Sequence, residues 1–458
     1  MKLLKKVAFF SPLNPIRSGI SDYSEDILPY LERNFGIDLY VSTGFSIENE
    51  SIKSKFPVRY FSDFERIYRN QGYDALIYHL GNNDEAHHEI YEMFLRYPGI
   101  VVLHDYSLHH FFAGKTIGQG HNEQYCDEMS YNYGDNGLEK ARQVLSKEIP
   151  PLWETSSLTY PLNLRILNRA LAVIVHSEFS AKLLRDQVSY VPISLIPMPS
   201  PHISRLEDLQ QEKETARQAL GIADDDIVIA SVGFVNPTKR IHKVIEALGY
   251  LKKNKQLQRF KYYIVGEVST SYHLREMVKK HGLQEHVVIT GYVRLDEFDT
   301  YIAASDICVN LRYPTQGESS ASLLKILGYG KSVIATNIGS FSEFPDEIVH
   351  KVGYDDSEVS DIAKSIVQIC GSDPYDTQRR VLEFVNLHHT LQICADHYAK
   401  LVDEIIEDRQ VNVFISLEKV IENYTKKVME FETGQTSLEE SLQRFANEVV
   451  DVFNREHP

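Results

Sequence analysis

The stretch DICVNLRYPTQGESSASLLKILGYGKSVIATN, residues 306–337, contains a short apolar strand, a polar loop, an apolar helix and a second short strand. The runs ICVN and SVIAT have the composition of buried strands, whereas ASLLKIL between them has apolar residues at helical spacing. Two strands joined by a helix form a βαβ unit, and the strands of such a unit are parallel. The stretch therefore predicts an α/β fold.

The same alternation runs through most of the chain. Strand-like runs form two series, which are VAFF, DLYVST, DALIYHL, IVVLHD and LAVIVHS, and then IVIASVG, KYYIVGE, VVITGYV and the opening stretch. The proline-rich segment IPMPSP separates the two series. We therefore predict two doubly wound Rossmann-like domains, at 1–198 and 199–375, followed by helices at 376–410 that cross back toward the first domain.

The last segment, residues 411–458, contains two amphipathic pieces with apolar residues three and four apart. TGQTSLEE between them supplies a glycine break and a capping box. These features predict a helical hairpin. Its apolar stripe could pack against its own domain, or it could bind a protein partner or a second copy of the chain.

Length and composition bound the function. A chain of 458 residues is long enough for two domains, and a formal net charge of -16 argues against nucleic acid as a partner. The four cysteines lack CxxC spacing, which fits a reducing cytoplasm and gives no support to a cysteine metal site. No apolar run approaches the roughly 20 residues of a membrane span. We expect a cytoplasmic protein, with peripheral contact at the inner membrane face as an option through Lys2, Lys5 and Lys6.

Ligands of doubly wound sheets bind at the carboxyl ends of the strands, so the loops there are the candidate sites. In NPIRSGISDYS, Ser18 and Gly19 stand between a strand and a helix. Backbone N–H groups at a helix start attract anions, and glycine permits close approach. A plain tight turn explains this loop equally well.

The loop LHDYSLHHFF carries His104 and Asp105 directly after the apolar strand IVVL. A histidine there could hydrogen-bond a substrate hydroxyl or act as a base, with Asp105 orienting it. His109 and His110 follow one turn later. Zinc would need a third ligand of suitable spacing, and none is evident. The alternative is that the histidine only makes hydrogen bonds within the local structure, for example as a helix cap.

The loop VGFVNPTKR places Gly233, Lys239 and Arg240 before the helix IHKVIEAL. Two cations at a helix N-terminus suit a pyrophosphate leaving group, because negative charge develops there as its bond to a sugar breaks. Solvated surface cations are the alternative.

The loop RYPTQGESSAS follows the strand DICVNL and places Glu318 at the same sheet edge. A carboxylate suits the recognition of sugar hydroxyls, and free backbone amides suit phosphate. These amides belong to the helix start, at Ser319, Ser320, Ala321, Ser322 and Leu323. Alternatively, Glu318 only complements the helix dipole.

Taken together, these loops resemble those of the retaining GT-B glycosyltransferases of family four, over about residues 5–410. SPLNPIRSGISDYS resembles the acceptor-side glycine loop of the family, VVLHD its HD strand end and VIVHSEFSAKLL its SxFS segment. SVGFVNPTKRIHKVIEA resembles the donor loop, and the opening stretch resembles the E-x7-E region. Among these, LHDYSLHHFF with GESSAS is similar to a bacterial subgroup.

The resemblance implies a nucleotide-sugar donor, a UDP- or GDP-sugar, bound mainly by the second domain. It implies that Lys239 meets the diphosphate, that Glu318 holds donor-sugar hydroxyls, that the backbone of 320–323 cradles the diphosphate, and that His104 lies near the anomeric centre. It also implies retention of configuration and no metal or other cofactor, since fixed cations and helix dipoles take the place of a metal.

The chain departs from the family pattern in four places, one of which is the hinge, where Pro-Met-Pro stands in place of Asn-Gly. Phe234 stands where the family has an arginine, and Ala321 stands where it has a glycine. Lys325 and Ile326 occupy the region of the second acid, which normally holds the ribose. Recognition of the ribose by that acid is therefore absent.

These observations predict a glycosyltransferase whose acceptor is a polysaccharide intermediate, a lipid-linked sugar or a protein. The alternative is a noncatalytic GT-B partner or chaperone of another glycosyltransferase, because a fold does not fix a function. A nucleotide-sugar epimerase would need further acids around the anomeric carbon, and the sequence shows no such set.

Overall fold

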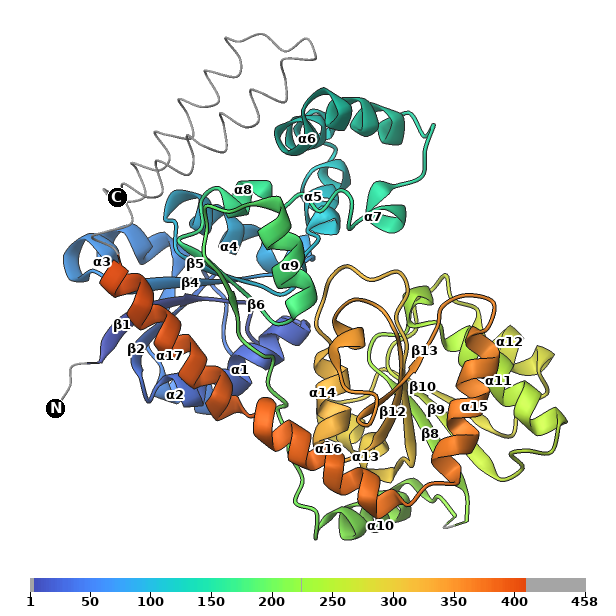
Figure 1. The fold of residues 1–458 in the computed structure, drawn as a ribbon. Coiled ribbons are helices and arrows are strands. Elements are labelled where there is room, and N and C mark those ends of the chain that lie inside the picture. The colour runs from blue at the N-terminus through green and yellow to red at the C-terminus, as the bar shows by residue number, and fades with distance from the viewer. Residues whose placement is uncertain (1–3, 224, 409–458) are drawn as a thin grey trace. The chain divides into compact units, whose positions relative to one another are not determined.

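The computed structural model describes residues 4–223 and 225–408. They form two compact units (Figure 1). Within the described chain, the first unit comprises residues 4–197, 316–318 and 394–408, and the second comprises 198–315 and 319–393. The proline-rich segment thus contains the division, between Pro197 and Met198. The helical hairpin predicted for 411–458 lies outside the described residues.

In the described residues, the first unit has a seven-stranded parallel sheet in the order β3-β2-β1-β4-β5-β6-β7. Its strands are β1 (Lys5–Phe10), β2 (Phe35–Val41), β3 (Val58–Tyr60), β4 (Ala75–Leu80), β5 (Ile100–Leu103), β6 (Ala172–Val175) and β7 (Ile193–Leu195). Its helices are α1 (Gly19–Leu31), α2 (Glu50–Lys55), α3 (Phe64–Gln71), α4 (Asp84–Arg96), α5 (His109–Lys115), α6 (Asn122–Leu145), α7 (Leu152–Thr155), α8 (Leu164–Leu167), α9 (Glu178–Gln187) and most of α17 (Leu391–Asp408).

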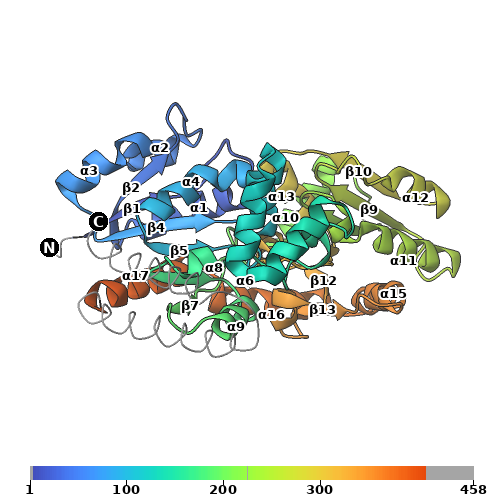
Figure 2. The same cartoon turned by 90° about the horizontal axis from the view of Figure 1, so that it is seen from above.

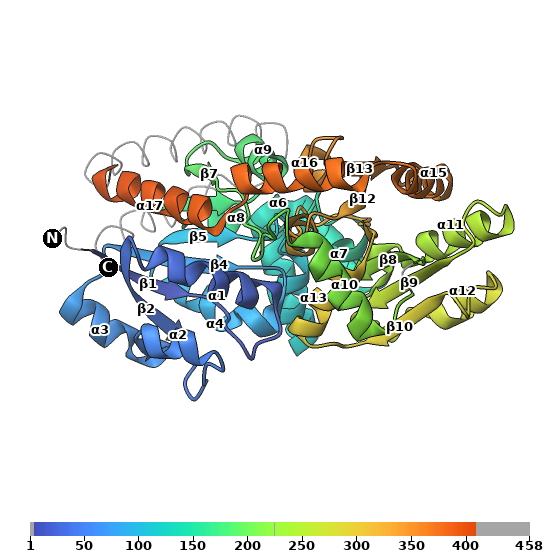
Figure 3. The same cartoon turned by 90° about the horizontal axis from the view of Figure 1, so that it is seen from below.

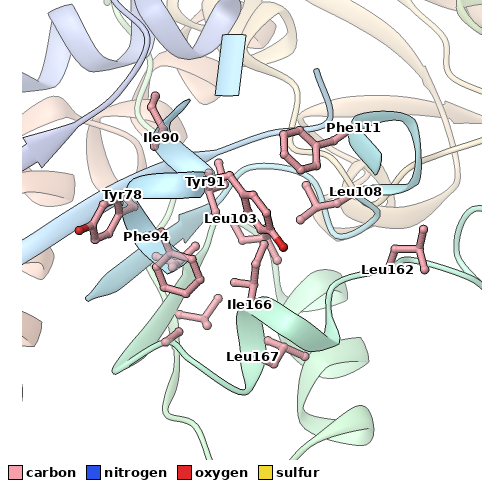
Figure 4. Close-up of a cluster of buried hydrophobic side chains, with 14 of the residues drawn as sticks. Tyr78, Ile90, Tyr91, Phe94, Leu103, Leu108, Phe111, Leu162, Ile166 and Leu167 are labelled. Atoms are coloured by element: carbon pink, nitrogen blue, oxygen red, sulfur yellow. The ribbon is translucent and has the colours of Figure 1, made fainter. Parts of the chain in front are cut away.

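One face of this sheet packs on a large aromatic core (Figure 4). Tyr78 and Leu103 come from neighbouring strands, Phe94 from α4, Phe111 from α5 and Ile166 from α8, and all are buried. Each side chain of this size stabilises the fold by about 1.5–3 kcal/mol when it is fully buried. Because successive strand residues alternate between faces, the neighbours of Tyr78 and Leu103 point to the opposite face.

Helix α17 lies beside α1 on the first unit (Figures 1 and 3). The Tyr398 hydroxyl of α17 lies 2.9 Å from the Tyr23 hydroxyl of α1. The connection between β5 and β6 holds α5 to α8, and Figure 2 shows α6 as two helical pieces. They meet at Gly134, whose φ of 61° favours glycine.

The described part of the second unit has a six-stranded parallel sheet in the order β10-β9-β8-β11-β12-β13. Its strands are β8 (Ile227–Val232), β9 (Phe260–Val265), β10 (Val287–Gly291), β11 (Ile307–Asn310), β12 (Ser332–Thr336) and β13 (Val349–Val352). Its helices are α10 (Leu209–Leu220), α11 (Ile241–Lys253), α12 (Leu274–Lys280), α13 (Leu295–Ala304), α14 (Ala321–Gly328), α15 (Glu358–Cys370) and α16 (Pro374–His388), with the short 3-10 helix η3 (Pro237–Lys239) before α11. The prediction of two doubly wound α/β halves is confirmed.

Candidate functional site

Lys239 lies in the loop between β8 and α11, and its charged end turns back onto that loop. The Lys239 Nζ donates to the backbone oxygen of Val232 at 2.7 Å, and the residue is 8% exposed. The last residue of η3 is Lys239 itself, so the turn that precedes α11 fixes its backbone. The ammonium is thereby held at the carboxyl end of β8, where the sequence predicted a cation.

Two glycines shape this loop. A Cβ atom on Gly233 would lie 2.8 Å from Lys239 Nζ. The φ of Gly233 is 103°, a conformation that other residues rarely adopt. A Cβ atom on Gly266, which follows β9, would lie 2.2 Å from the Gly233 oxygen. The backbone that follows β9 therefore touches the loop that holds Lys239.

Arg240 follows Lys239 and binds a carboxylate of the second unit. Its guanidinium forms a bidentate pair with the buried Glu358 of α15, with an Nε–Oε1 distance of 2.6 Å. This hydrogen bonding raises the pKa of Arg240 above its ordinary value. The same guanidinium lies 5.4 Å from the ring centre of Tyr313. The charge of Arg240 is therefore balanced within the protein.

Helix α14 begins with a cap that also involves β11. Ser320 is the N-cap, and its side chain accepts a hydrogen bond from the Leu323 backbone at 3.2 Å. Asn310, the last residue of β11, donates to the Ser320 and Ser322 hydroxyls at 3.2 and 3.1 Å. Sequence reasoning missed Asn310, although it ends the otherwise apolar run ICVN. Ser319 and Ser322 are half-buried and Ala321 is exposed.

The Lys239 loop and the loop that leads to α14 are hydrogen-bonded to each other. The Thr238 backbone oxygen accepts from the Tyr313 backbone at 2.8 Å, and its hydroxyl accepts from Arg312 Nη1 at 2.8 Å. The strands before these loops, β8 and β11, are direct neighbours. The structure thus brings the predicted cation and the predicted amide cradle to one edge of one sheet. Phe234 lies in the same loop as Lys239 and is 55% exposed.

Lys325 and Ile326 lie within α14, where the resemblance to family four led us to look for a second acid. The Ile326 side chain is fully buried. The Lys325 Nζ lies 2.5 Å from Asp299 of α13. Residues 325 and 326 of α14 thus carry a paired lysine and a buried apolar side chain.

A pocket of about 510 Å³ lies where β9 and β10 end. Glu267, Tyr272, Arg275, Thr290 and Tyr292 are among its lining residues. Tyr292 is 59% exposed and is the more exposed of the two tyrosines of the pocket, Tyr272 and Tyr292. The Tyr272 hydroxyl accepts from the His242 backbone at 2.9 Å, at the start of α11, so the pocket wall is tied to the helix after Lys239.

In the first unit, Gly19 begins α1 and Ser18 caps it. The Ser18 side chain accepts from the Ile20 backbone at 3.2 Å. No atom would lie within 4 Å of a Cβ atom on Gly19. The space beside this turn is therefore open.

His104 lies directly after β5, and its ring contacts other histidines. Its Nε2 lies 3.0 Å from Nδ1 of His79 in β4, and its ring centre lies 5.0 Å from that of His176, after β6. Burial lowers the pKa of His104 well below its ordinary value, and the neighbouring histidines lower it further. The Asp105 carboxylate accepts from the Asn82 backbone at 2.8 Å. Sequence reasoning missed His79, which lies inside β4, and His176, which directly follows β6.

His109 and His110 have separate environments. His109 Nδ1 donates to the Tyr160 oxygen at 2.7 Å, and its Nε2 accepts from the Tyr125 hydroxyl at 2.8 Å. His110 Nε2 lies 3.2 Å from Glu154. Over residues 4–223 and 225–408, no group of three or more histidine, cysteine or acidic side chains is arranged to hold a metal ion.

Glu318 belongs to a three-residue segment that groups with the first unit. The Gln316 and Gly317 oxygens accept from the Ser107 backbone at 3.0 Å and the Ser180 hydroxyl at 2.7 Å. The Glu318 carboxylate accepts from the Gln316 backbone at 2.6 Å. Glu318 thus belongs to the unit that contains His104.

Among the helices of the described chain, none is both long enough and apolar enough to cross a membrane.

Comparison with known proteins identifies the fold. Residues 212–381 match the family model of the Glycosyl transferases group 1. A sucrose-phosphate synthase from Thermosynechococcus elongatus superposes with a TM-score of 0.61 at 15% identity, over 88% of this chain and 99% of that one. HepE of Anabaena, in complex with UDP and glucose, gives 0.58 at 16% identity, over 88% and 100%.

A glycosyltransferase from Rickettsia africae gives a TM-score of 0.60 at 15% identity, over 88% of this chain and 99% of that one. No curated protein sequence matches the chain. The structural similarities confirm the predicted GT-B fold, and the match over 212–381 supports the prediction of a glycosyltransferase.

Proposed function

We propose that this protein transfers a sugar from a nucleotide sugar to an acceptor with retention of configuration and without a metal. The observation that carries the proposal is the buried ammonium of Lys239. It lies in the loop before α11, and that loop is hydrogen-bonded to the loop that leads to α14. A fixed cation next to helix N-termini stabilises the negative charge that develops on a diphosphate leaving group. The match to the Glycosyl transferases group 1 supports the same function.

The pocket at the ends of β9 and β10 suits the nucleoside part of the donor. Its volume of about 510 Å³ is enough for a base and a ribose, and Tyr292 offers a ring face for stacking. In this proposal, polar groups of the pocket bind the ribose hydroxyls. They take over the role of the second acid, which the chain lacks. UDP- or GDP-sugar is the proposed donor, and the HepE complex with UDP and glucose favours UDP.

The proposed reaction breaks the bond between the anomeric carbon and the diphosphate oxygen. Lys239 and the amides of 320–323 receive the charge on the leaving diphosphate. The acceptor hydroxyl attacks from the same face, and its proton passes to the leaving phosphate oxygen, so that charge and atoms balance. Glu318 holds hydroxyls of the donor sugar, and His104 lies near the anomeric carbon.

A test of this proposal measures donor binding and turnover. UDP-, GDP- and dTDP-sugars are screened by thermal shift, because a ligand at 100 times its Kd adds about 2.7 kcal/mol of stability. Hydrolysis of the best binder is then followed. Lys239→Gln should lower its rate by about 100-fold or more, as expected when a fixed group that stabilises developing charge is lost.

The matched control is Lys243→Gln in α11, where the lysine pairs with Glu246 at 3.2 Å. It should leave binding and turnover unchanged. A protein that neither binds nor turns over any of the nucleotide sugars would refute the proposal.

A noncatalytic GT-B partner of another glycosyltransferase is the second candidate. The buried Ile326 and the pair between Lys325 and Asp299 favour it, because they leave the region of the second acid without a free carboxylate. Binding of a nucleotide sugar without any turnover, together with unchanged behaviour of Glu318→Ala, would support this second function.

For the catalytic proposal, the acceptor is a polysaccharide intermediate, a lipid-linked sugar or a protein, in the cytoplasm or at the inner membrane face. Segment 411–458 is the proposed surface for a partner or a second copy. Self-association is tested by deleting this segment and comparing the mass of the two proteins in solution.

A further inference from the structure

Four histidines meet under α1 in the first unit, each from a different element. His79 lies in β4, His87 in α4, His104 after β5 and His176 after β6, and each is at most 8% exposed. The ring centres of His79 and His104 are 5.3 Å apart, and Tyr23 packs edge-on against His104 at 5.0 Å. The His104 ring is thus surrounded by other aromatic rings of the first unit.

The hydrogen bond between His79 Nδ1 and His104 Nε2, at 3.0 Å, contains one proton. Burial, with neighbouring histidines adding to it, lowers the pKa of both rings well below 6.5, so both are neutral near pH 7. A neutral imidazole has one N–H donor and one bare nitrogen. Either His104 donates from Nε2, or His79 donates from Nδ1.

The second nitrogen of His79 decides between these arrangements. His79 Nε2 is buried and has no hydrogen-bond partner among the described residues. If His104 donated, the proton of His79 would sit on Nε2 as a buried N–H without an acceptor. Among backbone groups, orphaned buried N–H groups are rarer than under-satisfied acceptors, and we apply the same order to these ring nitrogens. The arrangement in which His79 donates from Nδ1 is therefore the more favourable one.

We propose that His79 is a positioning residue that fixes His104 with its proton on Nδ1, so that His104 donates a hydrogen bond to a substrate oxygen and does not act as a base. His79 is fully buried and His104 is 7% exposed, so of the two residues only His104 has surface that a ligand can touch. The role of His104 toward substrate rests on the proposed glycosyltransferase function, whereas its tautomer does not.

The tautomer is tested directly in the protein without ligand. With ¹⁵N-histidine labelling, long-range ¹H–¹⁵N correlations at pH 7.5 report which ring nitrogen carries the proton. His109 and His176 serve as internal references, because their Nδ1 atoms face backbone oxygens at 2.7 and 2.8 Å and must be protonated there. His104, identified by its loss in His104→Gln, should show the same pattern. An Nε2-protonated or averaged pattern overturns the proposal.

Two substitutions of His79 separate positioning from folding. His79→Leu removes the donor, and should abolish the Nδ1 pattern of His104 and lower kcat by about tenfold or more, with KM for the donor nearly unchanged. His79→Asn keeps an N–H near the position of Nδ1, and should restore both the pattern and most of kcat. The surface variant His88→Gln on α4 is the control and should change neither.

Retention of the Nδ1 pattern in a folded His79→Leu protein overturns the positioning role. An absence of turnover with every nucleotide sugar would instead refute the proposed function, and the tautomer measurement would still stand. The two failures are therefore distinguishable.

Discussion

Gly233 shows how strongly the candidate site depends on one backbone position. Its φ of 103° strains any other residue, and a Cβ atom there would lie 2.8 Å from Lys239 Nζ. Gly233→Ala should therefore lower the free energy of unfolding by about 1–3 kcal/mol and displace the ammonium. The variant should also weaken donor binding, measured as a smaller stabilisation by the nucleotide sugar.

Gly36→Ala in β2 is the matched control, since no atom lies within 4 Å of its Cβ position. Its stability and donor binding should be close to those of the unchanged protein. If Gly233→Ala behaved in the same way, the backbone argument for the Lys239 loop would be wrong.

At the scale of elements, the start of α14 combines a structural role with a proposed binding role. Ser320 caps the helix and accepts from Asn310, so Ser320→Ala should destabilise the protein by about 1 kcal/mol. Because the amides of 320–323 are the proposed diphosphate cradle, the Kd for the donor should rise as well. Denaturant unfolding and a titration with the nucleotide sugar measure the two effects.

A second helix cap in the same unit provides the comparison. Asp373 caps α16 by accepting from the Tyr375 backbone at 3.0 Å. Asp373→Ala should cost similar stability and leave the Kd unchanged. Equal effects of both variants on the Kd would show that α14 has no special part in donor binding.

At the scale of the whole molecule, stability should fall below pH 6.5. The folded-state pKa is well below 6.5 for His79 and His104 and about 4 for His87 and His176, in each case mainly because burial disfavours the charged ring. Below pH 6.5 the unfolded chain therefore binds more protons than the folded protein does. The free energy of unfolding decreases as the pH falls toward 4. Each histidine contributes a slope of up to about 1.4 kcal/mol per pH unit.

Urea unfolding at pH 7.5, 6.5 and 5.5 measures this slope. His176→Asn removes one of the four groups and should make the slope shallower. The Tyr23 ring packs against the cluster, and its hydroxyl contacts Tyr398 and Cys394. Burial raises the pKa of all three groups, so they stay neutral over this range. A slope that is the same in both proteins would contradict the prediction.

The sequence predicts the fold well where strands form apolar runs and less well at the sheet edges. The edge strands β3 (VRY), β7 (ISL) and β13 (VHKV) are short and contain polar residues, so they form no apolar run. The sequence also predicts that loop residues such as Lys239 and Ser320 lie at the carboxyl edge of the sheet, because each follows a strand. The contacts of Asn310 and His79 could not be predicted, because a single polar residue in an apolar run carries no mark of the partner that tertiary packing gives it.

The close approach of Gly266 to Gly233 has a consequence for directed evolution of this protein. A side chain at position 266 would meet backbone, which cannot move aside, and both glycines have a positive φ that other residues rarely adopt. A saturation library at positions 233 and 266 should therefore yield few folded members. Phe234, next along the chain and 55% exposed, can vary without that cost. Selection for altered donor preference is best begun at Phe234, because the fold constrains the choice of side chain there least.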